Sequence, residues 1–541
     1  MTATEDLRAA AERWLGDDPD PATRDELRSV LAAAHDGDST ELADRFAGPL
    51  RFGTAGLRGP LRAGPNGMNR AVVRQAAAGL VNWLAAGDLA GPLVIGYDAR
   101  HGSREFAAET ARVATGAGRP AYVLPRPLPT PVLAHAVRAL RAAAGVMVTA
   151  SHNPPQDNGY KVYLSDGAQL VPPADAEIEA AIRAVGPLRD VPLGAPGEVL
   201  GESIVESYVD AAVARAAPGG PRDLSVAYTP LHGVGAAVLT EVLRRAGFPA
   251  PASVREQVEP DPEFPTVAFP NPEEPGAMDR VTALTVSTGA DLAIANDPDA
   301  DRCAVAVPLP AGGLRMLRGD EVGVLLADHL MRRGVTGRYA TTIVSSTQLR
   351  ALCAARGQEY GETLTGFKWI VRAGPGLVFG YEEALGYCVA PELVRDKDGI
   401  TATLLVCELA AELKATGHTL ADRLDELARE FGVYATDQLS VRVTDLAQIA
   451  RAMAHIRRHP PAALLDEPVS DTDDLLPDAD VLTLRTPAAR VVVRPSGTEP
   501  KLKAYLEVIE PVLGDDVAAA RERARAGLAA LRAEVAHALG L

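Results

Sequence analysis

The sequence predicts an α/β protein with three similar mixed α/β-sheet domains and a smaller C-terminal α+β domain. Its 541 residues exceed the roughly 250 to 300 residues at which a single hydrophobic core stops growing. An apolar strand, a small or polar turn, an amphipathic helix and a Gly recur in this order three times, beginning at Pro92, Asp223 and Gly337. Such alternation favours βαβ units, whose helical crossovers build sheets with parallel strands.

The expected domain boundaries follow changes in composition. Residues 1–45 predict an N-terminal helical extension, and Pro/Gly-rich segments at 186–198 and 307–313 separate the α/β repeats. Toward the C-terminus, short strands surround one hairpin-like turn before a long Ala/Arg/Glu-rich helix. The four predicted domains after the extension are residues 46–203, 204–315, 316–435 and 436–541.

Composition excludes several classes of function. With 47% apolar and 23% charged residues, the chain is typical of globular proteins. A formal charge of -17 argues against binding nucleic acid or an anionic membrane, because both need a basic face. The four cysteines lack metal-binding spacing and are too few for a disulfide scaffold, which favours a reducing compartment. With neither a signal peptide nor a long apolar run, we expect a cytoplasmic protein.

The first loop that carries candidate catalytic residues is Thr149–Pro154. It follows the apolar run 145–148, so Ser151 lies just past a strand end, where open α/β sheets usually place ligands. Ser151 is therefore a candidate nucleophile; the alternative is that Ser and Asn only build a turn before the proline. His152 is its neighbour, which makes a Ser-His dyad awkward, and we interpret His152 as a residue that shapes the catalytic loop.

The second loop contains three aspartates at two-residue spacing, Asp297, Asp299 and Asp301, directly after an apolar strand. Two carboxylates about 4 Å apart repel by roughly 4 kcal/mol at an effective dielectric near 20, so a hard divalent cation is the natural remedy. An EF-hand would need Gly where Arg302 stands and Glu where Pro308 stands. A solvated acidic turn remains the alternative to a Mg²⁺ or Ca²⁺ site.

The third loop carries Glu382 and Glu383 between glycines, in the segment FGYEEALGYCV. Paired acids can accept hydrogen bonds from vicinal sugar hydroxyls, although Glu-Glu pairs are more often solvated surface.

The fourth loop, residues 490–505, gathers cations and hydroxyls in one turn between two strands. It offers a guanidinium fork and free N–H groups to a phosphate, while a plain hairpin turn is the alternative. The residues concerned are Arg494, Ser496, Gly497, Thr498, Lys501 and Lys503. No Gly-Lys-Ser/Thr of a P-loop occurs anywhere in the sequence, and Gly233 and Gly235 form only half of a dinucleotide-binding fingerprint.

Taken in order, these four loops resemble those of the α-D-phosphohexomutase superfamily. TASHNP is similar to its phosphoserine loop, DPDADR to its metal loop, GYEEALG to its sugar loop and RPSGTEPKLKAY to its phosphate loop. RFGTAGLRG at 51–59 is similar to the start of the family's first domain, so the resemblance runs from about residue 45 to the C-terminus.

The resemblance implies four domains around a central cleft and a phosphosugar as the small-molecule partner. Phosphorylated Ser151 would transfer its phosphoryl group to a sugar phosphate, the bound bisphosphate (glucose 1,6-bisphosphate for a glucose substrate) would turn around, and Ser151 would take back the other phosphoryl group. Mg²⁺ would be held by the three aspartates and one phosphoserine oxygen. Lys161 matches the family's lysine and is a candidate general acid/base, a role that requires a lowered pKa.

The remaining roles are implied in the same way. Arg302 would lie beside the transferring group, and Glu382 and Glu383 would bind sugar hydroxyls with help from Lys368. The other phosphate would be held by Arg494, Ser496, Gly497, Thr498 and Lys503. Arg58, Arg100 and His101 would line the wall of the first domain.

The sugar loop, together with VRDKDG, resembles the branch with bacterial phosphoglucomutases and animal phosphopentomutases. The glutamate pair favours interconversion of glucose 1-phosphate and glucose 6-phosphate, and mannose phosphates, pentose phosphates and a glucose 1,6-bisphosphate synthase stay open. A metal-dependent phosphatase and a non-catalytic sugar-phosphate-binding protein are rivals from other classes. A monomer and a homodimer are both compatible with the sequence.

Overall fold

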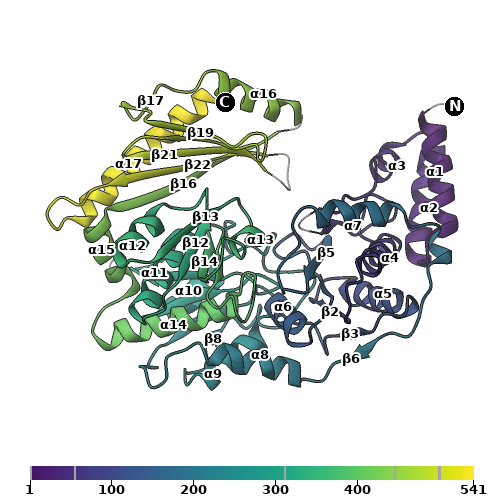
Figure 1. Cartoon of the computed structure of the whole chain (residues 1–541), viewed down its shortest axis with the longest axis horizontal. Coiled ribbons are helices and arrows are strands. Elements are labelled where there is room, and N and C mark those ends of the chain that lie inside the picture. The colour runs from purple at the N-terminus through teal and green to yellow at the C-terminus, as the bar shows by residue number, and fades with distance from the viewer. Residues whose placement is uncertain (1–2, 54–55, 310–311, 444–445, 497–500, 541) are drawn as a thin grey trace.

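The computed structural model describes residues 3–53, 56–309, 312–443, 446–496 and 501–540 (Figure 1). Three helices come first and lie at one end of the molecule: α1 (Ala3–Asp17), α2 (Pro21–His35) and α3 (Thr40–Arg45). The side chain of Asp20 accepts a hydrogen bond from the N–H of Ala22 and so caps α2. Leu27 and Leu42 belong to the small apolar core that these helices share.

The first α/β unit is a six-stranded sheet in the order β1-β5-β4-β2-β3-β6. Its strands are β1 (Leu57–Pro60), β2 (Leu93–Tyr97), β3 (Ala121–Val123), β4 (Ala144–Val148), β5 (Asp157–Leu164) and β6 (Glu198–Val199). Its helices are α4 (Arg70–Ala86), α5 (Ser103–Gly116), α6 (Thr130–Ala139) and α7 (Ala174–Arg183), followed by the short 3₁₀ helix Leu188–Asp190.

The second unit is a five-stranded sheet in the order β11-β10-β9-β7-β8. Its strands are β7 (Val226–Thr229), β8 (Ala252–Ser253), β9 (Leu292–Ala295), β10 (Ala304–Pro308) and β11 (Leu314–Met316). The helices of this part of the chain are α8 (Ser203–Val213), α9 (Ala236–Arg245) and α10 (Asp279–Thr288).

The third unit is a four-stranded sheet in the order β13-β12-β14-β15. Its strands are β12 (Arg338–Thr342), β13 (Glu359–Thr363), β14 (Leu377–Glu382) and β15 (Gly386–Cys388). Its helices are α11 (Gly319–Arg332), α12 (Gln348–Arg356), α13 (Phe367–Ile370), α14 (Gly399–Ala415) and α15 (Leu420–Phe431).

These three units share one strand arrangement, which confirms the predicted repetition of a mixed α/β sheet. In each, two strands pair in parallel, β2 with β4, β7 with β9 and β12 with β14. The second strand of each pair then turns back into an antiparallel strand, β5, β10 or β15 respectively. The turn that follows β4, β9 or β14 is therefore the same topological position in all three units.

The fourth unit is an antiparallel sheet in the order β16-β22-β21-β20-β19, and the predicted α+β character of this region is confirmed. Its strands are β16 (Val433–Arg442), β19 (Asp471–Asp474), β20 (Leu482–Arg485), β21 (Ala489–Pro495) and β22 (Lys501–Glu510). The helices α16 (Leu446–Arg458) and α17 (Val517–Ala538) accompany it, with the small hairpin β17 (Ala463–Leu464) and β18 (Glu467–Pro468).

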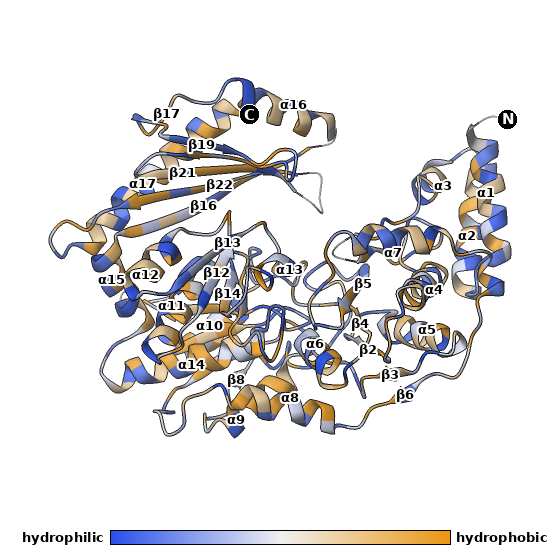
Figure 2. Ribbon diagram, viewed as in Figure 1, coloured by the Kyte–Doolittle hydropathy of each residue, from blue (hydrophilic) through white to orange (hydrophobic). Residues whose placement is uncertain are grey.

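One apolar core runs through the three α/β units, and the buried tyrosines Tyr163, Tyr228 and Tyr381, one from each sheet, belong to it. Helices α8 and α14, largely apolar in Figure 2, pack in this core. The fourth sheet has a separate core, centred on Val491 and Leu506. All four cysteines are buried and free. Within the described chain, no helix combines the length and apolar character needed to cross a membrane.

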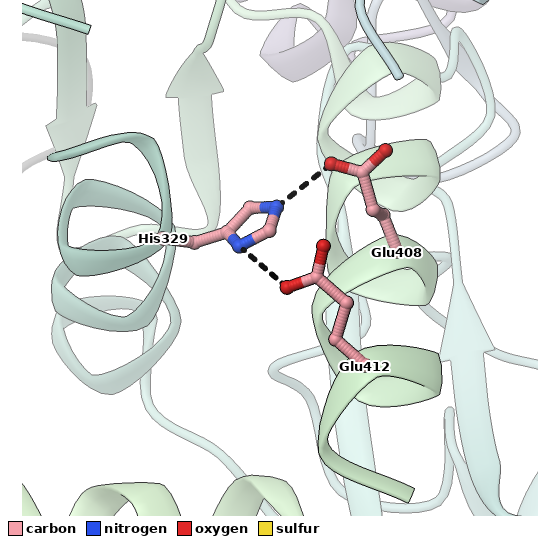
Figure 3. A group of neighbouring side chains, drawn as sticks. All are labelled: His329, Glu408 and Glu412. Atoms are coloured by element: carbon pink, nitrogen blue, oxygen red, sulfur yellow. Dashed lines mark hydrogen bonds and ion pairs between the residues drawn. The ribbon is translucent and has the colours of Figure 1, made fainter. Parts of the chain in front are cut away.

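A buried polar link joins α11 to α14 inside this core (Figure 3). The Nε2 atom of His329 lies 2.9 Å from Oε1 of Glu408, and its Nδ1 atom lies 3.6 Å from Oε2 of Glu412. Arg333 donates a second hydrogen bond of 2.7 Å to Oε1 of Glu408, and the N–H of Ala217 donates to Oε2. Both oxygens of Glu408 therefore have donors, as buried polar groups usually do, while Nδ1 of His329 is buried without a hydrogen-bond partner.

Candidate active site

Three of the four predicted loops occupy the equivalent turn of the three α/β units. Ser151 lies between β4 and β5, the three aspartates lie between β9 and β10, and Glu382 ends β14 just before β15. Each turn follows the carboxyl end of a strand in a parallel pair, the position where α/β sheets bind ligands. The shared topology explains how residues 146 positions apart in sequence reach hydrogen-bond distance, as Ser151 and Asp297 do.

Ser151 is buried in a strained turn and faces the aspartates. Its φ is +51°, in the left-handed region, which costs a residue other than Gly about 1–3 kcal/mol unless its surroundings impose it. The N–H of Ser151 donates to Oγ1 of Thr149 (2.8 Å), and its Oγ donates to Oδ2 of Asp297 (2.8 Å). The nucleophile candidate and the first metal-ligand candidate are therefore in direct contact.

His152 also reaches the serine, although its adjacency in sequence makes a Ser-His dyad awkward. Its Nδ1 atom lies 3.2 Å from Oγ of Ser151. Burial, followed by the positive charges of Arg302 and Arg58, lowers the pKa of His152 well below its ordinary value. A neutral imidazole in this position can exchange a hydrogen bond with the serine hydroxyl.

The three aspartates form a buried carboxylate cluster with free coordinating capacity. Ligand oxygens of Asp297, Asp299 and Asp301 lie within 4.8 Å of one another. Oδ1 of Asp299 and Oδ1 of Asp301 are buried without a hydrogen-bond partner. Burial, reinforced by the other two carboxylates, raises the pKa of Asp297 well above its ordinary value. Two orphaned oxygens in an all-oxygen donor set fit a hard divalent cation such as Mg²⁺.

Two lysines compensate part of this negative charge. Nζ of Lys161 lies 2.7 Å from Oδ2 of Asp299 and 3.2 Å from Oδ2 of Asp301, and Nζ of Lys397 lies 3.2 Å from the latter oxygen. Burial opposes the charged form of Lys161, but Asp299 and Asp301 outweigh it, so the pKa of Lys161 is raised. The lowered pKa that the sequence-based role of Lys161 requires is therefore not found in this arrangement.

The first-unit arginines hold the Ser151 loop. Nη1 of Arg58 donates to Oδ1 of Asn153 (3.2 Å), and burial lowers the pKa of Arg58. Nη2 of Arg100 donates to the carbonyl of Ser151 (2.7 Å). The predicted wall residue His101 instead turns to a surface contact with Glu263, 2.5 Å away.

Arg302 extends the aspartate loop toward a second acidic group. Its backbone N–H donates to Oδ1 of Asp297 (3.0 Å). Its guanidinium lies 3.7 Å from Oε2 of Glu273 and 4.0 Å from Oδ1 of Asp301. Burial raises the pKa of Glu273, and Arg302 opposes that shift. Arg302 is thus held between two carboxylates, with its Nε atom buried and unbonded.

The glutamate pair is partly buried: Glu382 and Glu383 are neither fully exposed, as the surface alternative expects, nor closed off from solvent. Burial raises the pKa of Glu382 to about 7, although Lys397 and Arg302 oppose the shift. Burial and the nearby charge of Asp320 raise the pKa of Glu383 to about 7. Oε2 of Glu383 lies 3.3 Å from Oγ of Ser345. Carboxylates with so few donors can accept hydrogen bonds from a ligand.

The fourth loop contributes two cations on neighbouring strands. Arg494 and Lys503 occupy partner positions of β21 and β22. Nη1 of Arg494 lies 3.4 Å from the hydroxyl of Tyr505, and Nζ of Lys503 lies 6.0 Å from the centre of that ring. The N–H of Ser496 donates to the carbonyl of Lys501, whereas the predicted residues Gly497 and Thr498 lie outside the described residues.

Lys368, at the start of α13, interacts electrostatically with Arg494 of the fourth loop. Its Nζ atom lies 5.8 Å from the ring centre of Trp369. Burial lowers the pKa of Lys368; Asp175 opposes this shift and Arg494 adds to it.

Sequence reasoning missed three residues at this site. Thr130, the first residue of α6, donates to Oδ2 of Asp299 (2.6 Å). Lys397 contacts Asp301, and Glu273 contacts Arg302. Only Lys397 had a signal in the sequence, its position in VRDKDG shortly after the glutamate loop; the other two come from segments without a recognisable motif.

Comparisons with known proteins agree with this architecture. Four models of phosphoglucomutase/phosphomannomutase domains match in order, alpha/beta/alpha domain I at residues 49–188, domain II at 206–310, domain III at 318–431 and the C-terminal domain at 439–524. The chain therefore belongs to the phosphoglucomutase/phosphomannomutase family, within the α-D-phosphohexomutase superfamily. It is an enzyme of the phosphohexomutase class.

Relatives within this family differ in the sugar that their names give. A "Probable phosphomannomutase" of Haemophilus influenzae is 46% identical over 82% of this chain and 93% of its own length. A phosphoglucomutase of Staphylococcus aureus is 33% identical over 88% of this chain and 93% of its own length. A human phosphopentomutase is 32% identical over 94% of this chain and 92% of its own length. The solved structure of a phosphoglucomutase/phosphomannomutase family protein of Burkholderia thailandensis, 20% identical, has a TM-score of 0.68 over 89% of this chain and 97% of that one, which shows a shared fold.

Proposed function

We propose that this enzyme interconverts glucose 1-phosphate and glucose 6-phosphate through a phosphorylated Ser151. The observation that carries the proposal is the hydrogen bond of 2.8 Å between Oγ of Ser151 and Oδ2 of Asp297. It joins a nucleophile candidate to a carboxylate cluster with two orphaned oxygens, so the serine oxygen lies where a metal-bound phosphoryl group would be carried.

In this proposal Mg²⁺ would be held by Asp297, Asp299 and Asp301, and it would neutralise the charge of the transferring phosphoryl group. Lys161 and Arg302 add positive charge beside the same oxygens. Phosphoryl transfer depends mainly on positioning and on such charge stabilisation, and little on covalent help from the protein.

Each transfer exchanges one phosphorus–oxygen bond for another. The free sugar hydroxyl forms a bond to phosphorus as the bond between phosphorus and Oγ of Ser151 breaks, and the hydroxyl proton leaves. Lys161 is the candidate that would give a proton to the departing serine oxygen and take the proton of the attacking hydroxyl. Its contacts with Asp299 and Asp301, which raise its pKa, would have to weaken for it to release that proton. The bisphosphate, glucose 1,6-bisphosphate, then turns around and the same steps run in reverse.

The sugar and the second phosphate would be held by the other two loops. Glu382 and Glu383, partly accessible carboxyls with few donors, would accept hydrogen bonds from sugar hydroxyls. Lys368 lies near enough to Arg494 for the two charges to interact. The distal phosphate would be bound by Lys368, Arg494, Ser496, Gly497, Thr498 and Lys503.

A mannose phosphate is the second candidate substrate, favoured by the name of the Haemophilus influenzae relative. The decisive experiment measures kcat/KM for glucose 1-phosphate and mannose 1-phosphate in the presence of Mg²⁺, with inorganic phosphate monitored in parallel. Isomer formation without matching phosphate release supports a mutase, whereas phosphate release at the rate of turnover would identify a phosphatase.

A further inference from the structure

A segment of the second α/β unit crosses to the Ser151 loop of the first. Residues 254–278 contain neither helix nor strand. Within this segment, the ring of Phe264 lies 4.8 Å from Cζ of Arg100, a cation–π distance. The ring of Phe269 lies 6.4 Å from that of His152. The unit that carries the aspartates is therefore packed directly on the loop that carries the serine.

Arg100 is the link between Phe264 and the serine. Its Nη2 atom donates to the carbonyls of Ser151 (2.7 Å) and Asn153 (2.5 Å). Its Nη1 atom donates to the carbonyls of Pro154 (2.7 Å) and Asp157 (3.2 Å). One buried guanidinium thus holds four carbonyls of the loop, and the rigid fork of Arg makes this arrangement difficult for any other side chain.

Two residues with strained backbones, Ser151 and Phe264, both contact Arg100. Ser151 has φ +51° and Phe264 has φ +46°. Both angles lie in the left-handed region, which Gly adopts readily and which side-chain-bearing residues other than Asn and Asp rarely adopt. Both residues are almost completely buried. Strain of this kind persists only where the surroundings over-determine the backbone, and it gathers at functional sites. Asp98 supports Arg100 from another side, with its Oδ2 atom 3.4 Å from Nε.

We propose that Phe264 is a positioning residue for phosphoryl transfer. From the second unit it fixes the plane of Arg100, and through Arg100 it fixes the backbone of Ser151 relative to Asp297. The inference rests on the proposed role of Ser151 as the phosphoryl carrier. Because Phe264 acts on the loop backbone and not on the sugar loop, its loss should slow the transfer and leave substrate binding nearly unchanged.

The chain offers a closely matched control. Phe248 is buried in the same unit, and Cζ of Arg222 lies 4.9 Å from its ring. Arg222 likewise donates to backbone carbonyls, those of Ala217 and Ala246. The two pairs share residue types, ring distance and carbonyl bonding, but only Arg100 binds the Ser151 loop.

The experiment compares Phe264→Leu with Phe248→Leu in the full-length enzyme, measuring kcat, KM and the thermal unfolding midpoint. We expect both variants to lose similar stability. Phe264→Leu should lower kcat by about 10-fold with KM within about two-fold, since misplacement by ~1 Å can cost up to about 100-fold. Phe248→Leu should keep kcat within about two-fold.

A kcat for Phe264→Leu equal to that of Phe248→Leu, or a raised KM with unchanged kcat, overturns the inference. If Phe264→Leu does not fold, Phe264→Met, whose flexible unbranched side chain adapts better to an irregular space, is measured against Phe248→Met with the same expectations. Ser151→Ala is assayed alongside. If Ser151→Ala keeps activity, the proposed function fails, and the inference fails with it; if Ser151→Ala is inactive while the Phe264 variants behave like their controls, the inference alone fails.

Discussion

Two groups of buried carboxylates in this enzyme have opposite surroundings. Glu408, between α11 and α14, receives donors from His329, Arg333 and the backbone of Ala217, and these outweigh burial to lower the pKa of Glu408. In the aspartate cluster of the candidate active site, burial and the other two carboxylates raise the pKa of Asp297, whereas Lys161 and Thr130 outweigh burial and lower that of Asp299.

Both groups contain three potential metal ligands within 4.8 Å, so the proximity of ligands does not identify the functional site. What distinguishes them is the state of the carboxylate oxygens. Both oxygens of Glu408 accept hydrogen bonds, whereas Oδ1 of Asp299 and Oδ1 of Asp301 have no partner in the described chain. A buried carboxylate without donors is costly, and it is retained where a ligand supplies what is missing.

Removing Mg²⁺ should affect the aspartate cluster and leave the cluster around Glu408 unchanged, and we expect this to be the largest difference between the two. We expect exhaustive chelation to abolish mutase activity, because the aspartate cluster would lose its cation. The free energy of unfolding should change by no more than about 3 kcal/mol, the linkage expected for an ion bound at roughly 100 times its Kd. Activity assays and thermal unfolding with EDTA, followed by Mg²⁺ replacement, check this. Full activity after chelation, or global unfolding, would contradict a catalytic metal site.

Ser151→Ala should lower turnover by at least about 1,000-fold, since it removes the proposed phosphoryl carrier. The fold should be unaffected, because the side chain is small and lies in a turn. The measurement is kcat for glucose 1-phosphate in an assay coupled to glucose 6-phosphate, with circular dichroism as the folding control. A variant with near-wild-type turnover would exclude the phosphoserine.

Glu408→Gln tests the structural side of the comparison. It removes one partner from a buried charged network, so we expect a loss of about 3 kcal/mol in the free energy of unfolding. In contrast, kcat/KM should stay within about two-fold. Glu412→Gln is the matched control: its carboxylate is partly exposed and lies 3.6 Å from His329, so the expected loss is under about 1 kcal/mol. A large fall in kcat/KM for Glu408→Gln would give this group a functional role.

The fold class and the positions of Ser151 and the aspartates just after strands could be predicted from the sequence, because both depend on local patterns. Strand and helix alternation repeats along the chain, and Ser151 and the aspartates each follow an apolar strand. The equivalence of the three turns was not predictable, since it depends on antiparallel return strands such as β15, only three residues long. Thr130 and Glu273 were missed for a similar reason: their roles arise from tertiary contacts, and nothing near them in sequence indicates a site.

The expectations for His152 and Lys161 show where local reasoning fails. Sequence adjacency makes a contact between His152 and Ser151 awkward, but with the left-handed backbone of Ser151 the two side chains lie within 3.2 Å of each other. The pKa of Lys161 depends on two aspartates about 140 residues away, as the contacts with Asp299 and Asp301 show.

The preference among sugar phosphates tests the proposed role of Glu382 and Glu383, and its expected effect is the smallest. Both orientations of the bisphosphate must present a hydroxyl pair to Glu382 and Glu383, and in glucose the 3-OH and 4-OH are both equatorial. Mannose shares these two hydroxyls and differs at C2, so a site that binds only C3 and C4 cannot reject it strongly. A ribose phosphate is smaller and would leave one of these carboxylates, covered by the bound sugar, without a donor, at a cost of ~1 to 3 kcal/mol, or about 5- to 150-fold in kcat/KM.

We therefore expect kcat/KM to be highest for glucose 1-phosphate, lower for mannose 1-phosphate by no more than roughly two orders of magnitude, and lowest for ribose 1-phosphate. Glu383→Gln should narrow the ratio between glucose and ribose, because an amide that loses a hydroxyl partner costs less than a carboxylate. The matched control is Glu412→Gln, which should leave the ratio unchanged. If ribose or deoxyribose 1-phosphate were the best substrate, the enzyme would be a phosphopentomutase, and the proposed binding of sugar hydroxyls by Glu382 and Glu383 would be wrong.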